Sequence, residues 1–225
     1  MDLKREAAEK AAGLIRDKST VGLGAGSTIA HVVDFLKREI EKGLQVKVVT
    51  SSSSTRQLLL KNEFTILPIA SVSKIDIYFD GCDQLDKKLN ALKSGGGIHT
   101  HEKLLATMAD QFVLIGDKSK LVDNFDTRFP LVIELLPEAL VFAPEKIQSL
   151  FPGVRSVFRI SDKKDGFVIT DNGNYLLDVW FQQWPDLATL NPILKTVTGI
   201  VETSLFYNVA HKAIIAGEDG VKIYN

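Results

Sequence analysis

The sequence predicts an α/β protein in which a mostly parallel sheet is followed by a second, smaller α+β domain. Up to residue 128, short apolar strands alternate with segments of helical periodicity. Alternation of this kind produces parallel strands joined by right-handed crossovers. From residue 129 onward, strands follow one another without long crossovers, which is typical of an antiparallel sheet. We therefore expect a main domain of residues 1–128 and 205–225 and a small domain of residues 129–204.

The composition is that of an ordinary globular protein, with 45% hydrophobic and 24% charged residues. The formal net charge of −1 gives no global field that favours nucleic acid or an acidic membrane surface. No apolar run approaches the length of a membrane-spanning helix, and no signal peptide is visible. Cys82 is the only cysteine, which excludes an internal disulfide framework and fits a reducing compartment. We expect a cytoplasmic protein that binds neither nucleic acid nor membrane.

Periodicity places the individual elements along the chain. In the first part, strands are expected at residues 20–23, 44–49, 64–69, 75–79 and 112–115, and helices at residues 2–16, 29–40, 55–61 and 102–110. In the second part, strands are expected at residues 131–136, 154–160, 167–170 and 175–181, and helices at residues 144–150 and 185–194. Asp171-Asn-Gly-Asn174 is a strong hairpin signal between two of these strands. The apolar run of residues 205–216 is expected to rejoin the first sheet.

A glycine-rich loop, Gly22-Leu-Gly-Ala-Gly-Ser-Thr28, lies between the first predicted strand and the helix that follows it. A helix N-terminus presents unpaired amides and the positive end of its dipole, so this loop is a natural phosphate site. Ser27 and Thr28 add hydroxyl donors, although they are equally suited to capping the helix. The glycine spacing matches neither the dinucleotide-binding fingerprint nor a P-loop, so a plain turn with a helix cap remains the alternative.

A second motif-rich stretch, residues 80–103, begins at the carboxyl end of a predicted buried strand. Ligands of open parallel α/β sheets bind beyond such strand ends. The stretch offers carboxylates, one cation and bare backbone amides: Asp80, Asp83 and Glu102; Lys93; Gly95, Gly96 and Gly97. A base, a cation and a group of amides suit proton abstraction next to a carbonyl, with stabilisation of the resulting oxyanion. The alternative is a polar loop with a solvated charge cluster.

These motifs together resemble the ribose-5-phosphate isomerase A family. Residues 22–28 are similar to its phosphate loop, residues 80–83 to its Asp-Gly-Ala-Asp motif, residues 93–97 to its Lys-Gly-Gly-Gly run, and Glu102-Lys103 to its terminal Glu-Lys. Residues 117–120, 170–174 and 199–203 also match family blocks. The motifs agree in order and distance, and the likeness covers nearly the whole chain.

The resemblance implies interconversion of ribose 5-phosphate and ribulose 5-phosphate through an enediolate, without a cofactor or a metal. It implies a Rossmann-like main domain with helices on both faces, a small ferredoxin-like domain, and a homodimer or homotetramer. Glu102 then moves a proton between C1 and C2 of the sugar, while Lys93 and the amides of residues 95–97 stabilise the enediolate. Asp80 and Asp83 handle hydroxyl protons and ring opening.

The resemblance also defines a substrate-binding set. Ser27, Thr28 and Lys120 are expected to hold the phosphate, with Lys4 assisting. The complete set consists of Ala25, Gly26, Ser27, Thr28, Asp80, Gly81, Cys82, Asp83, Lys93, Ser94, Gly95, Gly96 and Lys120. The expected partner is therefore a small sugar phosphate.

Several residues depart from the family pattern. The departures are Ala25 for threonine, Cys82 for alanine, Gln84 for glutamate, Ser94 for glycine, His101 for arginine and Ser204 for glycine. Ser94 matters most, because a Cβ there strains the loop if the position needs a positive φ. In that case we expect a slower enzyme that Ser94→Gly accelerates. Alternatively, Ser94 has a negative φ and its hydroxyl makes a useful hydrogen bond.

Two rival functions are open at this point. Sugar-phosphate sensor domains share this type of sheet and its glycine loops but lack catalysis, and an assay for isomerisation separates them from an enzyme. A metal enzyme is the other rival, because His99 and His101 with Asp80 and Asp83 supply nitrogen and oxygen ligands. No Cys or Glu-x-x-His pattern supports it, and we interpret both histidines as surface or loop residues.

Overall fold

The computed structural model describes residues 2–225, and the chain divides into two compact units. The first unit comprises the residues up to 90 together with 101–123 and 208–225, and the second comprises 91–100 and 124–207. These units differ from the expected domains mainly at residues 91–100, which cluster with the second unit. The expected domains of residues 1–128 with 205–225 and of residues 129–204 stay a prediction.

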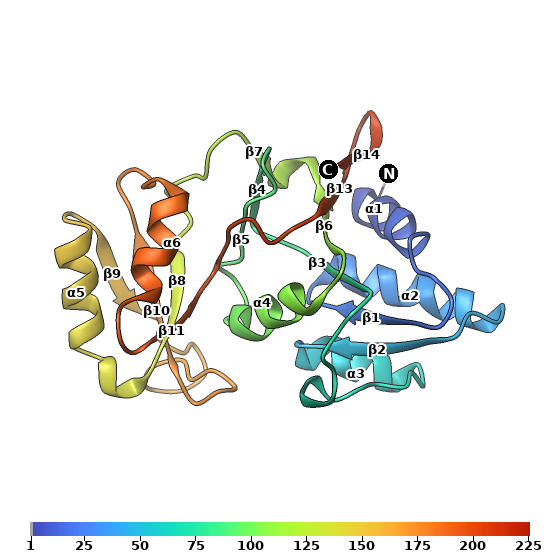
Figure 1. Ribbon diagram of the computed structural model, residues 1–225, viewed down its shortest axis with the longest axis horizontal. Coiled ribbons are helices and arrows are strands. Elements are labelled where there is room, and N and C mark those ends of the chain that lie inside the picture. The colour runs from blue at the N-terminus through green and yellow to red at the C-terminus, as the bar shows by residue number, and fades with distance from the viewer. Residues whose placement is uncertain (1) are drawn as a thin grey trace. The chain divides into compact units, whose positions relative to one another are not determined.

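The first unit contains a six-stranded sheet of order β14-β13-β6-β3-β1-β2 (Figure 1). Its strands are β1 (Ser19–Leu23), β2 (Val46–Thr50), β3 (Ile77–Asp80), β6 (Phe112–Asp117), β13 (Lys212–Gly217) and β14 (Gly220–Tyr224). All neighbouring pairs are parallel except β13 and β14, which form an antiparallel hairpin. The predicted return of the chain to the first sheet is therefore confirmed, but it begins at Lys212 rather than at residue 205, and β14 is an additional edge strand.

Helices of the first unit form where apolar residues recur at helical spacing. They are α1 (Leu3–Ala12), α2 (Ser27–Glu41), α3 (Ser53–Lys61) and α4 (His99–Met108), the last of which begins in the second unit. The Asp2 side chain caps α1 by accepting a hydrogen bond from the Arg5 amide. The buried face of α1 consists of alanines, which allow close packing against α2. Gly13 is the C-cap, so the helix is shorter than the predicted residues 2–16.

The predicted strand at residues 64–69 is wrong. Only Ile66 forms an isolated parallel bridge, with Val48 of β2. Pro68 cannot donate a backbone hydrogen bond, so the pairing does not continue beyond it. A 3-10 turn (Ile69–Ser71) follows Pro68 where the end of the strand was expected. Two short strands that periodicity did not predict, β4 (Gln84–Asp86) and β7 (Leu121–Val122), pair in parallel in this unit.

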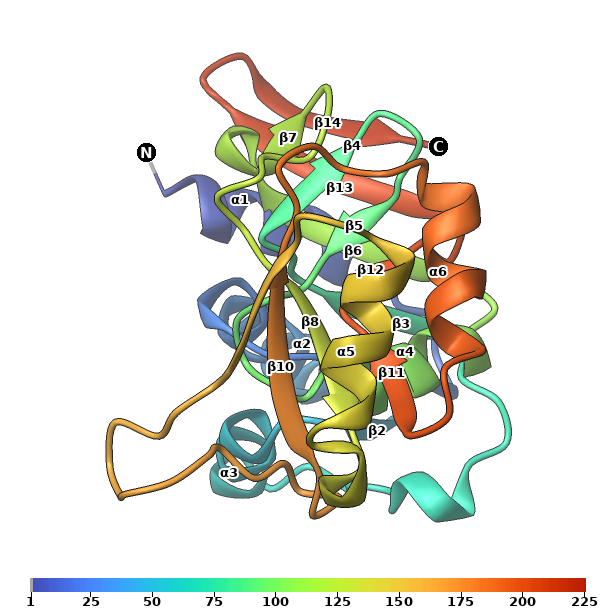
Figure 2. The ribbon, with the colours of Figure 1, turned by 90° about the vertical axis from the view of Figure 1, so that its left-hand side faces the viewer.

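The second unit contains an antiparallel sheet of order β11-β8-β10-β9. Its strands are β8 (Leu131–Leu135), β9 (Arg155–Phe158), β10 (Tyr175–Trp180) and β11 (Ile200–Thr203). Figure 2 shows α5 (Phe142–Leu150) and α6 (Leu187–Lys195) in front of these strands. Ala143, Ile147, Leu190 and Leu194 form the buried faces of the two helices. A further short pair, β5 (Ala91–Leu92) with β12 (Leu205–Phe206), is antiparallel.

The hairpin turn before β10 is present as predicted. The Thr170 amide donates to the Asn174 carbonyl at 2.9 Å, and Gly173 has a φ of 80°. The predicted strand at residues 167–170 is wrong, because this segment makes only isolated bridges through Phe167 and Ile169. An exposed loop that contains Lys163, Lys164 and Asp165 precedes this segment. The two bridged residues are too few to form a continuous ladder of hydrogen bonds.

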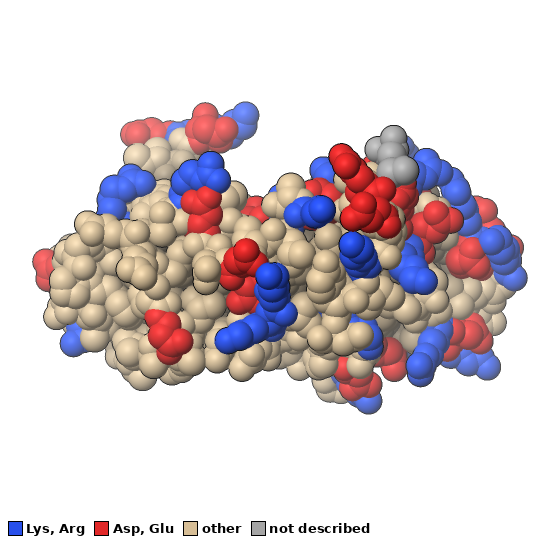
Figure 3. Space-filling model, turned by 90° about the horizontal axis from the view of Figure 1, so that it is seen from above, with Lys and Arg blue, Asp and Glu red and all other residues tan. Residues whose placement is uncertain are grey.

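Charged side chains of both signs are interspersed over the face shown in Figure 3. This distribution agrees with the formal net charge of −1. Among residues 2–225, no helix combines the length and the apolar character that a membrane crossing requires.

Candidate active site

The glycine loop of the first unit connects β1 to α2 and leaves the start of that helix without a side-chain cap. Gly26 is the N-cap residue, with a φ of 100°, and no side chain makes a cap hydrogen bond there. The alternative in which Ser27 or Thr28 caps the helix is therefore wrong. Ser27 is exposed and accepts a hydrogen bond from Lys4 Nζ at 3.1 Å. A helix N-terminus with an adjacent hydroxyl and cation is suited to an anion.

A second cation belongs to the same region. Asp117 ends β6, accepts hydrogen bonds from Ser119, and has Lys120 and Lys4 as its charged neighbours. Burial raises the pKa of Asp117, but the Ser119 hydrogen bonds and the two lysines outweigh it, so the pKa is lowered overall. The Lys120 side chain packs on Gly116, because a Cβ added to Gly116 would lie 3.2 Å from the Cγ of Lys120. Lys4 thus links Ser27 and the neighbourhood of Lys120.

Asp80 is fully buried at the end of β3 and is tied to the glycine loop. Its Oδ1 accepts hydrogen bonds from the Gly81 amide at 2.8 Å and the Ala25 amide at 3.2 Å. Gly24 makes this approach possible, because an added Cβ there would lie 2.0 Å from the Asp80 carboxyl carbon. The loop and the carboxylate are consequently packed as one piece.

Tyr78, two residues earlier on β3, completes this cluster. Its hydroxyl donates to Asp80 Oδ2 at 2.7 Å, and its ring is fully buried and stacks on Phe112. Burial and the nearby charges of Asp80 and Glu102 raise the pKa of Tyr78 well above its ordinary value of 10.0. Tyr78 therefore remains a protonated donor at neutral pH, and the Glu102 carboxylate is close enough to act on it electrostatically. Glu102 itself is 5% exposed, in the first turn of α4.

The remaining candidates of the first unit follow Asp80 directly. Gly81, Cys82 and Asp83 are half-buried and lead from β3 into β4. Cys82 is a free cysteine. Asp83 thus lies three residues beyond the buried carboxylate, at the same carboxyl edge of the sheet.

The other candidates, Lys93 to Gly96, belong to the second unit. Lys93 is 8% exposed, and its Nζ lies 5.7 Å from the centre of the Phe206 ring. Its amide donates to the Ser204 carbonyl at 3.0 Å. Ser204 also accepts a hydrogen bond from the Val132 amide through its Oγ, at 2.9 Å, which gives a structural use to one of the departures. Gly95 and Gly96 are exposed.

Ser94 does not have the strained conformation that the first interpretation required. Among the described residues, the non-glycine residues with positive φ are Lys18, Glu63, Leu89 and Asn208. The Ser94 hydroxyl donates to the Pro130 carbonyl at 2.6 Å. The expectation of an impaired loop is therefore wrong, and the alternative of a negative φ with a hydrogen-bonding hydroxyl is what the structure contains. The positive φ falls instead on Gly97, at 70°.

The histidines do not support a metal site. His99 is completely buried at the start of α4, with its Nε2 3.3 Å from the Glu202 carbonyl oxygen, so its interpretation as a surface or loop residue is wrong. Within residues 2–225, no three His, Cys, Asp or Glu side chains are grouped so that they could hold a metal ion.

A family model described as ribose 5-phosphate isomerase A (phosphoriboisomerase A) matches residues 47–220. Ribose-5-phosphate isomerase A of Bacillus mycoides is 37% identical over 229 residues, which is 100% of both chains. The protein of the same name from Thermosynechococcus vestitus is 38% identical over 218 residues, covering 96% of this chain and 91% of its own. The chain belongs to the ribose-5-phosphate isomerase A family.

Solved structures of ribose-5-phosphate isomerases agree with this membership. That of ribose 5-phosphate isomerase A from Methanocaldococcus jannaschii has a TM-score of 0.91 and 33% identity, covering 99% of this chain and 97% of its own. A D-ribose-5-phosphate isomerase in complex with phospho-erythronic acid has a TM-score of 0.92 and 32% identity, with the same coverage. The resemblance inferred from the motifs is confirmed, and the chain is an isomerase enzyme with a sugar phosphate as its substrate.

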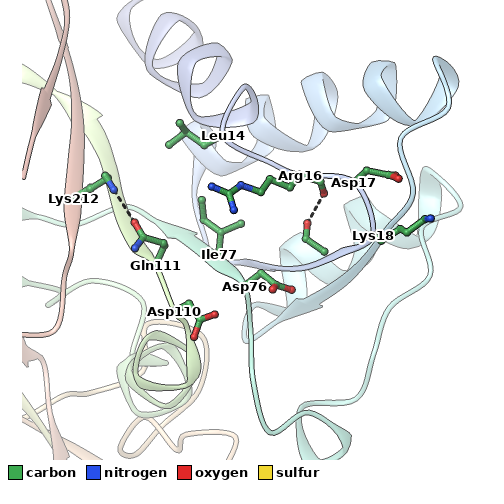
Figure 4. Close-up of a pocket in the computed structure, with 10 residues that line it drawn as sticks. Leu14, Arg16, Asp17, Lys18, Asp76, Ile77, Asp110, Gln111 and Lys212 are labelled. Atoms are coloured by element: carbon green, nitrogen blue, oxygen red, sulfur yellow. Dashed lines mark hydrogen bonds between the residues drawn. The ribbon is translucent and has the colours of Figure 1, made fainter.

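A hollow of about 510 Å³ lies at the amino ends of the strands of the first unit's sheet, opposite to the carboxyl ends that carry Asp80 and the glycine loop (Figure 4). It is lined by residues at the amino ends of strands, including Ser19, Asp76, Ile77 and Gln111. Figure 4 shows Lys212 directed to Gln111, to which it donates a hydrogen bond at 2.8 Å. The candidates in the glycine loop and at residues 80–83 follow the carboxyl ends of β1 and β3, where parallel sheets bind ligands, so this hollow is not assigned to catalysis.

Glu134, an acid within the apolar strand β8, was missed by the motif analysis. It is 1% exposed and accepts hydrogen bonds from Thr100, Thr170, Asn172 and Asn174. Burial raises the pKa of Glu134, but these hydrogen bonds together outweigh it and lower the pKa below its ordinary value of 4.5. The signal available in the sequence was a single carboxylate inside an otherwise apolar strand, since a buried charge requires partners.

Glu134→Gln is expected to destabilise the isomerase by about 1–3 kcal/mol at neutral pH, because the new amide would face donors that need an acceptor. The depressed pKa means that the contribution of Glu134 is present above its unfolded-state pKa and is lost as the pH falls through its folded-state pKa. Urea unfolding of parent and variant from pH 7 to pH 3 should therefore show a difference that shrinks toward acid. Glu138→Gln, at an exposed position, is the control. A difference that grows toward acid would contradict the assignment.

Proposed function

We propose that Glu102 is the base that moves the proton between C1 and C2 of the open-chain sugar phosphate. The observation that carries this proposal is the burial of the Glu102 carboxylate in the first turn of α4, near the cluster in which the Asp80 carboxylate accepts a hydrogen bond from the Tyr78 hydroxyl. Glu102 is nearly inaccessible to solvent and is positioned by the first turn of a helix, which suits a base that must reach two adjacent carbons.

In this mechanism, Glu102 removes the proton from C2 of the aldose, and the electrons move to the carbonyl oxygen to form an enediolate. Lys93 and the amides of Gly95 and Gly96 stabilise the negative oxygen. Asp80 and Asp83 transfer hydroxyl protons and assist ring opening, and Glu102 then returns its proton to C1 to give the ketose. The proton that leaves C2 is returned to C1 and the hydroxyl proton moves between the two oxygens, so the atoms and electrons of the aldose and the ketose balance.

The phosphate is held, in this proposal, by the N-terminus of α2 with Ser27, Thr28, Lys120 and Lys4. The support is the hydrogen bond from Lys4 to Ser27 and the presence of both lysines beside Asp117. The substrate-binding set is completed by residues that contribute backbone or packing contacts: Ala25, Gly26, Gly81, Cys82 and Ser94. Phospho-erythronic acid, with a phosphate at one end and a carboxylate at the other, is a suitable probe of both parts of the site.

Ribose without its phosphate is expected to be a poor substrate, with kcat/KM lower by about 10²–10⁴-fold. The loss corresponds to two or so charge-assisted hydrogen bonds at about 1.5–3 kcal/mol each. Phosphate binding also positions the reacting carbons, so kcat should fall together with affinity. Equal efficiency with ribose and ribose 5-phosphate, measured as ketose formation, would refute the phosphate site.

Substitution of Lys120 tests the same site from the protein side. Lys120→Met should raise KM for ribose 5-phosphate about tenfold or more and leave the slow reaction of ribose unchanged, because only the phosphorylated substrate uses the lysine. Lys118 and Lys120 lie on one 3-10 turn (Lys118–Lys120), and Lys118 is exposed. Lys118→Met is therefore the matched control and should have the KM of the parent.

We further infer a Rossmann-like first domain with helices on both faces, a ferredoxin-like small domain, cytoplasmic location, and a homodimer or homotetramer. The fold details are supported by the strand orders of the two sheets, and the location by the single cysteine. Assembly is supported by the apolar side chains of Val141 and Phe142, which are 65% and 54% exposed in the chain alone. Light scattering of the purified protein measures the number of copies.

A further inference from the structure

Arg159 connects the sheet of the second unit to the loop of residues 93–97. Its Nε and one terminal nitrogen donate to both oxygens of Asp178 on β10, at 3.1 and 2.6 Å. The two terminal nitrogens also donate to backbone carbonyls of the loop, at 2.8 Å to Ser94 and 2.9 Å to Gly95. A single guanidinium thus joins a strand carboxylate to two consecutive peptide groups.

The backbone of Arg159 is itself fixed. Its amide donates to the Leu176 carbonyl at 2.9 Å, and its carbonyl accepts from the Val168 amide at 2.8 Å. Arg159 and Asp178 are 21% and 15% exposed, so their bidentate pair is largely shielded from water. A paired and shielded guanidinium with fixed backbone holds its remaining donors in one direction.

The carbonyls that Arg159 binds determine where two amides point. A trans peptide is planar, so the N–H of Gly95 points opposite to the carbonyl of Ser94, and the N–H of Gly96 points opposite to that of Gly95. The described residues contain no cis peptide bond. By binding both carbonyls from one side, the guanidinium orients both amides toward the other side. Gly95 and Gly96 are exposed, so a ligand can approach them.

The two ends of the loop, Ser94 and Gly97, are held by contacts other than those of Arg159. Gly97 has a φ of 70°, and an added Cβ there would lie 2.7 Å from the side chain of Leu176. The Ser94 hydroxyl is bound to the Pro130 carbonyl. Both ends of the Ser94–Gly97 segment are therefore held by Pro130 and Leu176 of the same unit, and Arg159 controls the orientation of the peptides between them.

We propose that Arg159, anchored by Asp178, is a positioning residue that orients the Gly95 and Gly96 amides toward the oxyanion of the enediolate. The proposal rests on the oxyanion role given to these amides under the proposed function. Arg159 makes no contact with substrate in this mechanism, because its hydrogen bonds are directed to Asp178 and to the loop carbonyls. Its effect is exerted on the transition state through the direction of two N–H groups.

The test is Arg159→Lys, which keeps the positive charge but lacks the fork that binds a carboxylate and two carbonyls together. Turnover should fall about 10²-fold, the scale of an oxyanion donor displaced from its position. KM for ribose 5-phosphate and inhibition by inorganic phosphate should stay within about threefold of the parent, since the phosphate site is unchanged. Affinity for phospho-erythronic acid should fall with turnover, because in this proposal its carboxylate takes the place of the enediolate oxygen.

Arg155→Lys is the matched control. Arg155 lies on β9, four residues earlier, and its guanidinium stacks on Trp180 at 3.7 Å rather than binding the loop. This variant should retain parental turnover and inhibitor affinities. Thermal unfolding of both variants shows whether they are folded under assay conditions.

If Arg159→Lys does not fold, Asp178→Asn tests the same proposal. The neutral amide weakens the pairing of residue 178 with the Arg159 guanidinium, while Arg159 still reaches the loop. Its turnover should fall by a smaller factor, again without a change in phosphate inhibition. Parental turnover in a folded Arg159→Lys or Asp178→Asn variant overturns the proposal. A raised KM with unchanged turnover also overturns it, because Arg159 would then contact the substrate.

Lys93→Met separates failure of this proposal from failure of the oxyanion site itself. If Lys93→Met keeps parental turnover, the loop is not the oxyanion site and the proposed function is wrong at that point. If Lys93→Met is impaired and Arg159→Lys is not, only the positioning role of Arg159 is wrong.

Discussion

Glu102→Gln should lower the turnover of ribose 5-phosphate about 10³-fold while KM changes little. The amide keeps the size of the side chain in a position that is 5% exposed, so the helix and its packing should survive. What is lost is the ability to accept and return a proton, which contributes about 10²–10⁴-fold for a positioned general base. Ketose formation and inhibition by phospho-erythronic acid measure the two effects separately.

The control for this substitution is Glu145→Gln. Glu145 also lies in the first turn of a helix, α5, but it is exposed. Parental turnover is expected there. Near-parental turnover in Glu102→Gln itself would show that the proton is carried by a different group, with the Asp80 carboxylate as the next candidate to substitute.

Gly24→Ala should be the most disruptive single-methyl change in the first unit. The new Cβ would lie 2.0 Å from the Asp80 carboxyl carbon, and Asp80 is fully buried and cannot move into solvent. Overpacking typically costs about 1–3 kcal/mol, and displacing a hydrogen-bonded buried carboxylate costs about as much again. We expect a loss of about 3 kcal/mol or more in unfolding free energy, with turnover reduced because the Asp80 hydrogen bonds from Tyr78, Ala25 and Gly81 are disturbed.

Gly13→Ala is the matched control for that change. Gly13 has a φ of −66°, and its nearest neighbour to an added Cβ is a carbonyl oxygen 3.5 Å away. An alanine fits there and should be neutral or slightly stabilising, because it restricts the unfolded chain. Urea unfolding and activity of both variants test the difference, and a Gly24→Ala variant as stable and active as the parent would contradict the packing argument.

Local patterns were sufficient to predict the elements that carry the isomerase motifs. Strand β1 with its glycine loop, and strand β3 with Asp80 at its end, are apolar runs of four or five residues that end in characteristic loops. Short strands such as β4, β5 and β12 were not predicted, because two or three residues carry no periodicity and their pairing is decided by distant segments.

The supporting side chains were missed for a related reason. Arg159 is separated from Gly95 by 64 positions in the sequence, so nothing local indicates that it binds the loop. Tyr78 lies on an apolar strand in which an aromatic residue is ordinary, and its role depends on Asp80 and Glu102 being buried beside it. The conformation of Ser94 depended in the same way on a distant partner, the Pro130 carbonyl. Motifs therefore identified the groups expected to contact substrate but not the groups that hold them.

The position of β13 within the first sheet has a consequence for how the protein is made. This strand, residues 212–217, lies between β6 and β14 and also contacts α1. During synthesis, residues 112–117 leave the ribosome long before β13 exists, so β6 has an unpaired edge throughout that interval. An apolar strand with an open edge is prone to pair with another chain. Completion of the sheet joins distant parts of the sequence, which makes it a slow, late event of folding that depends on a strand made long after β6.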